Sequence, residues 1–196
     1  MKSFKRHFLP VLGVSVLSVS PALAHCGKCP ADVKEVVKQM EAGKVTGASM
    51  VSAAEAHAKG KAVGMIVDLE KGKMDAEVFV LVGDKVQAVE IDAAGKASKM
   101  EEAKGMTGMA DVSKAMDAAK LTVSGVIAAA ETHSKGKAVA VVATAPGGKA
   151  SFDVYAMAGD KLQKVKIDDH GHATGMSEAQ MLPGASEEKP KPKPGG

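Results

Sequence analysis

Apolar positions follow two different periods along the chain, and each change of period marks a boundary between a predicted helix and a predicted strand. In residues 30–42 the apolar side chains recur every three or four positions, which predicts a helix with Pro30 in its first turn. In residues 74–82 they alternate with polar side chains, which predicts a strand with one buried face. The apolar positions are Val33, Val36, Val37 and Met40 in the helix and Ala76, Val78, Val80 and Val82 in the strand.

The same order of elements occurs twice. The stretch AAEAHAKGKAV begins at residue 53 and AAETHSKGKAV begins at residue 129, an offset of 76 residues. GDKVQAVEID from Gly83 and GDKLQKVKID from Gly159 are separated by the same offset. Such self-similarity is the signature of a duplicated module, and each copy is short enough that its core is marginal alone. We therefore expect two similar modules that pack together.

Each module is predicted to be a helix packed on a three-stranded antiparallel β-meander, so the fold class is α+β. Thr46 can cap the first module's helix, and Gly60 can supply the left-handed residue that closes it. An extra short helix precedes each module, and residues 94–108 are expected to be a linker or a frayed helix. The strands are predicted at 62–70, 74–82 and 85–92 in the first copy and at 138–144, 149–158 and 161–168 in the second.

The first residues have the layout of a secretory signal peptide. A basic start is followed by the apolar run 8–19 and by a small-x-small site at Ala22–Ala24, and the run is too short to span a bilayer. Cleavage near Ala24 predicts a periplasmic or secreted protein with no transmembrane segment in its mature chain; lipid attachment at Cys26 is an alternative. The predicted division is 1–24 signal peptide, 25–45 cysteine-containing segment and helix, 46–101 first module, 102–121 linker helix, 122–177 second module and 178–196 disordered Pro/Lys tail.

Charge excludes one class of partner. The formal charge of the whole chain is +3, and Lys2, Lys5 and Arg6 of the predicted signal peptide account for all of it. A neutral mature chain has no electrostatic attraction to nucleic acid, and a single tyrosine with no tryptophan provides little for base stacking. We therefore expect no nucleic-acid partner.

The modules resemble the PepSY domain. The resemblance comprises an alanine-rich helix, Gly-Lys-Ala-Val entering a strand, Gly-Asp-Lys before another strand, and the endings Ile91–Gly95 and Ile167–Gly171, which both read Ile-Asp-x-x-Gly. It implies a small α+β fold and a non-catalytic role that binds a protein or peptide in the cell envelope, with restraint of a peptidase as one form. It implies no catalytic residue.

The sharpest candidate chemistry precedes the repeats. After cleavage at Ala24 the chain begins with His25, Cys26 and, three residues later, Cys29. Cys26 and Cys29 can form a disulfide in an oxidising compartment. Alternatively, His25, Cys26, Cys29 and the terminal amine are donors that suit copper or zinc. A redox dithiol is a third and weaker interpretation.

Other candidates have simpler structural explanations. His170 and His172 form a secondary metal-site candidate in the turn that follows the last strand of the second module, although turn histidines are often only solvated. His57 and His133 are equivalent positions near helix ends, where the helix dipole favours a cation. Methionines cluster around the linker, where they are soft metal ligands or core filler. They are Met100, Met106, Met109 and Met116.

No serine–histidine–acid set, phosphate-binding loop or zinc-protease motif is present in the sequence, so we do not expect an enzyme. The leading hypothesis is a non-catalytic envelope module that binds a protein or peptide. The alternative is a periplasmic metal-binding protein that uses His25, Cys26 and Cys29, followed by a thiol redox protein.

Overall fold

The computed structural model describes residues 27–184, and within them the chain is α+β with one antiparallel sheet of eight strands. The predicted signal peptide lies outside these residues. The first half contains α1 (Pro30–Gly43), α2 (Gly47–Ala58), β1 (Lys61–Glu70), β2 (Lys73–Val82), β3 (Lys85–Ile91) and β4 (Ala97–Glu102). The second contains α3 (Met109–Ala119), α4 (Val123–Ser134), β5 (Lys137–Thr144), the 3₁₀ turn η1 (Pro146–Gly148), β6 (Ser151–Ala158), β7 (Lys161–Ile167) and β8 (Ala173–Glu178).

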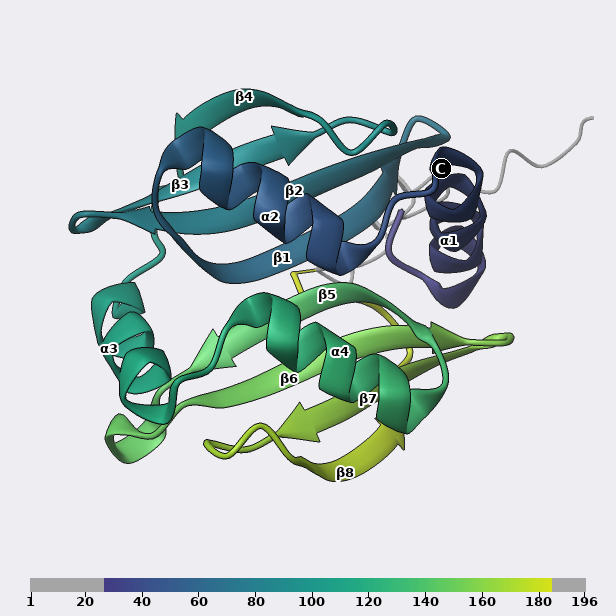
Figure 1. Cartoon of the computed structure of the whole chain (residues 1–196). Helices are drawn as coiled ribbons and strands as arrows, with labels where there is room; N and C mark the ends of the chain where they lie inside the picture. Colours follow the sequence, from purple (N-terminus) through teal and green to yellow (C-terminus); the bar gives the residue numbers. More distant parts are fainter. Residues whose placement is uncertain (1–26, 185–196) are drawn as a thin grey trace, which may run out of the picture.

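The two modules share this sheet rather than standing as separate domains. The strand order is β4-β3-β2-β1-β5-β6-β7-β8, so the first strand of each module lies at the centre and the two halves extend outward in mirror order (Figure 1). β1 and β5 pair antiparallel through Gly64–Val142, Met65–Val141 and Ile66–Ala140. The two copies are therefore related by an approximate two-fold axis that passes through the seam between β1 and β5.

The three-stranded meander predicted for each module was wrong, because each contains a fourth strand at the outer edge of the sheet. β4 lies within the stretch predicted as a linker, and β8 lies at the end of the second module. Both strands are mostly exposed and lack the apolar alternation that identifies a half-buried strand. Backbone pairing with β3 and β7, rather than burial of side chains, holds them in place.

The turn that leads into each edge strand is built by an aspartate. Oδ1 of Asp92 accepts hydrogen bonds from the backbone N–H groups of Ala94 and Lys96, each at 2.9 Å. Asp168 makes the same pair of bonds, also at 2.9 Å, to His170 and His172. These aspartates are therefore turn residues, and their turn reverses the chain into the strand that the sequence did not predict.

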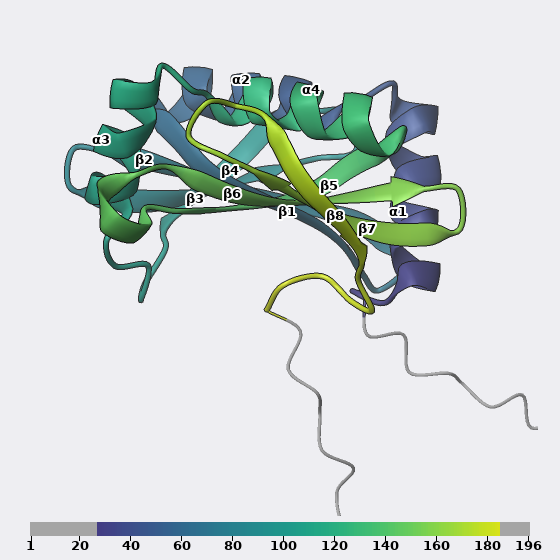
Figure 2. The same ribbon diagram turned by 90° about the horizontal axis from the view of Figure 1, so that it is seen from below.

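α2 and α4 lie side by side on one face of the sheet (Figure 2). Thr46 and Thr122 cap them, each accepting from a backbone N–H at 3.1 Å, as predicted for Thr46. The role predicted for Gly60 was wrong: Lys59 takes the left-handed conformation, with φ of 55°. A glycine is needed at position 60 because a Cβ there would lie 2.3 Å from the carbonyl oxygen of Leu81.

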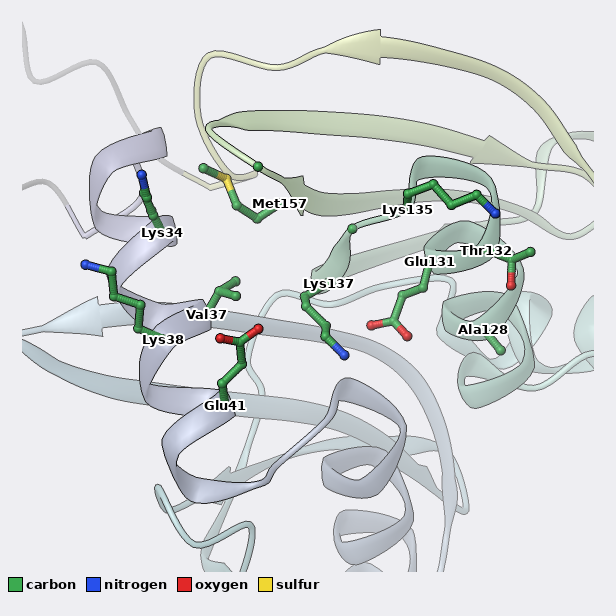
Figure 3. A pocket seen from close by; sticks show the side chains of 12 residues that line it. Lys34, Val37, Lys38, Glu41, Ala128, Glu131, Thr132, Lys135, Lys137 and Met157 are labelled. Carbon is green, nitrogen blue, oxygen red and sulfur yellow. The ribbon is translucent and has the colours of Figure 1, made fainter.

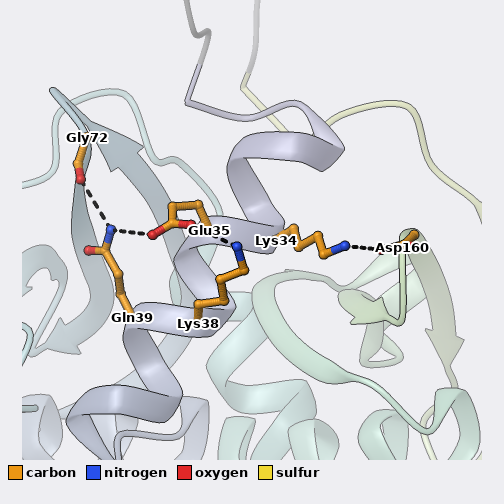
Figure 4. A network of polar contacts seen from close by, with 6 residues as sticks. All are labelled: Lys34, Glu35, Lys38, Gln39, Gly72 and Asp160. Atoms are coloured by element: carbon orange, nitrogen blue, oxygen red, sulfur yellow. Dashed lines mark hydrogen bonds and ion pairs between the residues drawn. The ribbon is translucent and has the colours of Figure 1, made fainter.

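α1 and α3 lie near opposite ends of the sheet and each contacts both modules (Figure 1). On α1, Gln39 binds the first module by donating to Gly72 O at 3.2 Å and accepting from Met74 N at 2.8 Å. From the same helix Lys34 pairs with Asp160 of the second module (Figure 4). The core between helices and sheet is rich in alanine, valine and methionine, and no helix among the described residues is long and apolar enough to cross a membrane.

Candidate functional site: the open face of the sheet

One face of the sheet carries no α2 or α4, and at the seam this face is apolar. Successive strand residues point to opposite faces, so Met65, which contacts Gly47 of α2, leaves Ile66 on the open side. Phe79 lies opposite Gly64 there, and Val142 follows on β5 with 37% of its surface exposed. Ile66, Phe79 and Val142 thus form a floor across the join between the modules.

Loops turn this floor into a groove of about 340 Å³. Met106, from the connection into α3, and Met109, the first residue of α3, line it together with Pro183 and Gly184. The latter two lie in the segment after β8, which runs beneath the open face (Figure 2). Its Leu182 is buried and donates a backbone hydrogen bond to Lys28 O at 3.0 Å. The tail predicted to be disordered from residue 178 is therefore packed as far as Leu182, because that side chain is buried; residues 185–196 lie outside the described residues.

Carboxylates flank the groove on the side of the first module. Asp68 and Asp75 are direct register partners on β1 and β2, and Glu77 and Glu90 are partners on β2 and β3. Facing like charges destabilise a sheet. Only Lys28, with Nζ 3.7 Å from Asp68, and Lys99, 3.2 Å from Glu90, form ion pairs with these four carboxylates within the described residues. We call Asp68, Asp75, Glu77 and Glu90 the acidic cluster.

The surroundings disfavour ionisation of Asp68, Asp75 and Glu77 of this cluster. Burial raises the pKa of Asp68, and the neighbouring Asp75 raises it further against the opposing charge of Lys28. Burial also raises the pKa of Asp75, with help from the charges of Glu70 and Glu90. The pKa of Glu77 is raised by burial first and then by Asp75 and Asp68. The folded chain therefore holds several carboxylates that are short of positive charge.

The second module shows that the fold does not require this arrangement. At the offset of 76 residues the equivalents of the acidic cluster are Thr144, Ser151, Asp153 and Lys166. Thr144 and Ser151 are register partners, as Asp68 and Asp75 are, but both are neutral. Asp153 has Lys164 at 3.6 Å. The same backbone thus carries a face with balanced charges in one copy and an acidic face in the other.

Sequence reasoning missed this cluster although its signal was present. The polar positions of residues 74–82, among them Asp75 and Glu77, were used only to mark the exposed side of a strand. A comparison of the polar faces of the two copies would have shown that the acidic residues are specific to the first.

The candidate thiol site falls mostly outside the described residues. His25 and Cys26 lie there, so the disulfide, metal and redox interpretations of Cys26 and Cys29 stay predictions. Cys29 is half-buried immediately before α1, with Sγ 3.0 Å from Oδ2 of Asp32. The same carboxylate oxygen accepts from Gly27 N at 2.8 Å. Asp32 is 2% exposed, so it anchors the entry into the helix.

The structure places His170 and His172 in an exposed turn, with ring centroids 6.3 Å apart. Their backbone N–H groups bind Asp168, and that of His172 is the main cause of the lowered pKa of this aspartate. Within residues 27–184 no three His, Cys, Asp or Glu side chains are grouped as metal ligands. His57 and His133 are exposed in the last turns of α2 and α4, as expected.

The linker methionines separate into different environments. Met116 is fully buried in the core, as expected of filler, and Met100 is 45% exposed on the edge strand β4. Met106 and Met109 meet at the open-face groove. The glutamates of the repeated motif are structural: Oε1 of Glu55 accepts from Ala62 N at 2.9 Å, and Glu131 repeats this with Ala138 N at 3.0 Å.

A second hollow of about 670 Å³ lies between α1 and the end of α4 (Figure 3). Four lysines surround it, but Glu41 and Glu131 lie among them. Lys34 and Lys38 are already paired, with Asp160 and with Glu35 respectively (Figure 4). The charges around this second hollow are thus largely balanced within the chain, unlike those of the acidic cluster. The lysines are Lys34, Lys38, Lys135 and Lys137.

Comparison with known proteins does not assign the chain to a family. No family model matches it, so the resemblance to the PepSY domain stays a prediction. No curated protein matches it either. Among solved structures, the chain is similar to a putative lipoprotein from Clostridium difficile 630, with 13% identity over 66% of this chain and 90% of that one. The TM-score of 0.39 is too low to carry an argument about fold or function.

Proposed function

We propose that this chain is a non-catalytic binding module of the cell envelope that holds an extended, cationic polypeptide segment in the open-face groove. The observation that carries the proposal is the position of the acidic cluster beside an apolar floor on the sheet face opposite α2 and α4. The location in the envelope is inferred from the signal-peptide pattern of residues 1–24.

The energetics favour a cationic partner. Each pair of facing like charges costs on the order of a few tenths of a kcal/mol or more in a sheet, and partial burial adds to the cost. Since Thr144 and Ser151 occupy the equivalent positions without that cost, the fold itself does not explain Asp68 and Asp75. A lysine or arginine of a bound segment would offset the repulsion between the carboxylates. Residues that lower the stability of the free protein can in this way strengthen binding of a cationic partner.

The shape of the groove favours an extended segment. Residues two apart on a strand or an extended peptide point to the same side. A bound segment can therefore place apolar side chains of one side on Ile66, Phe79 and Val142, and cations two or four residues further along on the same side can reach Glu77 and Asp75. Restraint of a peptidase, which the PepSY resemblance implies, is one form of this function, with a basic segment of the peptidase as the occupant.

The test is binding of a short fluorescent lysine–valine peptide in which one side carries valines at alternate positions of the first half and lysines at alternate positions of the second half, with serines between them. A glutamate–valine peptide of the same design is the charge control. Binding of the cationic peptide is expected to weaken at high salt and to weaken several-fold in D68T/D75S, which gives the first module the residues of the second. E41S/D84S removes the same charge away from the groove and is expected to bind like the native chain. Equal binding of both peptides, or none of either, would overturn the proposal.

A further inference from the structure

The described part of the chain ends in the wall of the groove. Leu182 is buried and bonded to Lys28 O, and Pro183 and Gly184 form part of the groove wall. A Cβ on Gly184 would lie 3.7 Å from Nζ of Lys28, and Lys28 is the residue whose Nζ lies 3.7 Å from Asp68. Whatever follows Gly184 is therefore tethered a short distance from the acidic cluster.

The residues that follow contain two glutamates and then three lysines in a regular pattern. They read ASEEKPKPKPGG, so Lys189, Lys191 and Lys193 alternate with prolines after Glu187 and Glu188. Lys189 is five residues beyond Gly184, and at up to about 3.3–3.6 Å per residue it can reach roughly 17 Å from that anchor. Nζ of Lys28 lies 3.7 Å from Asp68 and 3.7 Å from a Cβ at Gly184, so Asp68 of the acidic cluster is well within this reach.

Charge favours this occupant. The four carboxylates of the acidic cluster have only Lys28 and Lys99 as ion-pair partners within the described residues. Lys189, Lys191 and Lys193 lie within five residues of sequence, so one segment brings three cations to the same region.

We propose that residues 185–196 are an intramolecular occupant of the open-face groove, with Lys189, Lys191 and Lys193 against the acidic cluster, and that they compete there with a cationic partner. The proposed competition with a cationic partner rests on the proposed function. The tail is directed to the first module because the equivalent face of the second has neutral Thr144 and Ser151 and the cation Lys166. A tethered ligand acts at a high effective concentration, so weak individual contacts suffice.

Zero-length carbodiimide cross-linking of the full chain tests the docking directly, since it joins only amines and carboxylates in contact. Cross-links from the tail lysines to Asp68, Asp75 and Glu77 are expected to exceed those to Glu41 or Asp84. Mixing isotopically labelled and unlabelled chains separates links within a chain from links between copies. A uniform distribution of cross-links, or links formed mainly between copies, would overturn the proposal.

Competition is tested with the lysine–valine peptide. In the full chain K189S/K191S/K193S is expected to bind it several-fold more tightly, whereas K38S/K96S/K114S, which removes three lysines elsewhere, is expected to bind like the native chain. Unchanged affinity in the tail variant overturns competition. If no variant binds the peptide while the tail cross-links persist, the proposed function fails and the docking of the tail stands.

Discussion

Met65 and Val141 are register partners across the central seam and are also the same position in the two copies of the repeat. The approximate two-fold axis therefore passes between them. Each module supplies half of one core, because α2 and α4 contact each other above the strands that β1 and β5 join. The duplication creates a sheet face that neither module could offer alone, and the groove lies on that join.

This relationship predicts that one module does not fold alone. Residues 27–103, expressed without the second module, would expose the paired edge of β1 and the α4-facing side of α2. Such a fragment is expected to lack a cooperative unfolding transition as a monomer, because a small core that loses its partner surface is marginal. Circular dichroism during urea denaturation, combined with size-exclusion chromatography, checks this; a cooperatively folded monomer would show that the seam is dispensable.

The close approach at Gly60 predicts that alanine lowers the free energy of unfolding more at position 60 than at position 72. Gly60→Ala places a Cβ 2.3 Å from Leu81 O, so we expect a loss of about 2–3 kcal/mol in the free energy of unfolding. Gly72 is a matched control, because it has φ of 78° and a Cβ at this position would have no other atom within 4 Å. Gly72→Ala is expected to cost about 1 kcal/mol from its left-handed backbone alone. Equal losses by urea denaturation would contradict the steric explanation.

The glutamate of the repeated motif is predicted to stabilise the fold and not to bind a ligand. Glu55→Ala removes the acceptor of the Ala62 N–H group, and an unsatisfied partly buried donor costs about 1–3 kcal/mol. Glu55→Gln keeps an acceptor oxygen and is expected to cost less. His57→Ala, on the exposed end of the same helix, is expected to change stability by less than about 0.5 kcal/mol. Thermal denaturation of the three variants checks this order of stability losses. If His57 bound a metal, His57→Ala would instead cause the largest loss when metal is present.

The acidic cluster predicts a specific pH dependence. The pKa values of Asp68, Asp75 and Glu77 are raised in the folded state, so folding takes up protons and these groups lower stability above their folded pKa values. As the pH falls through those values toward the unfolded values, about 4, their penalty disappears. D68T/D75S should therefore be more stable than the native chain at neutral pH, and the difference should shrink in acid to a pH-independent remainder. Urea denaturation of both proteins at neutral and at acidic pH measures this difference in stability. A stability advantage of D68T/D75S that grows as the pH falls would contradict the raised pKa values.

Alternation and duplication were enough to predict the α+β class, the central strands and the capped helices, because these elements bury a patterned apolar face. The edge strand β4 has no such face: its Ser98, Lys99 and Glu101 are exposed, and it exists through backbone pairing with β3. The groove could not be predicted either. It forms where Val142 of one module meets Ile66 of the other, and no local pattern encodes which strands of two modules become neighbours.

The most direct measurement of the central claim is the affinity of the lysine–valine peptide for the full chain carrying K189S/K191S/K193S, with and without D68T/D75S. We predict salt-sensitive binding that falls several-fold when the two aspartates are replaced by the residues of the second module. Binding of the same strength in both proteins, or no binding in either, would contradict the claim that the acidic cluster holds a cationic segment.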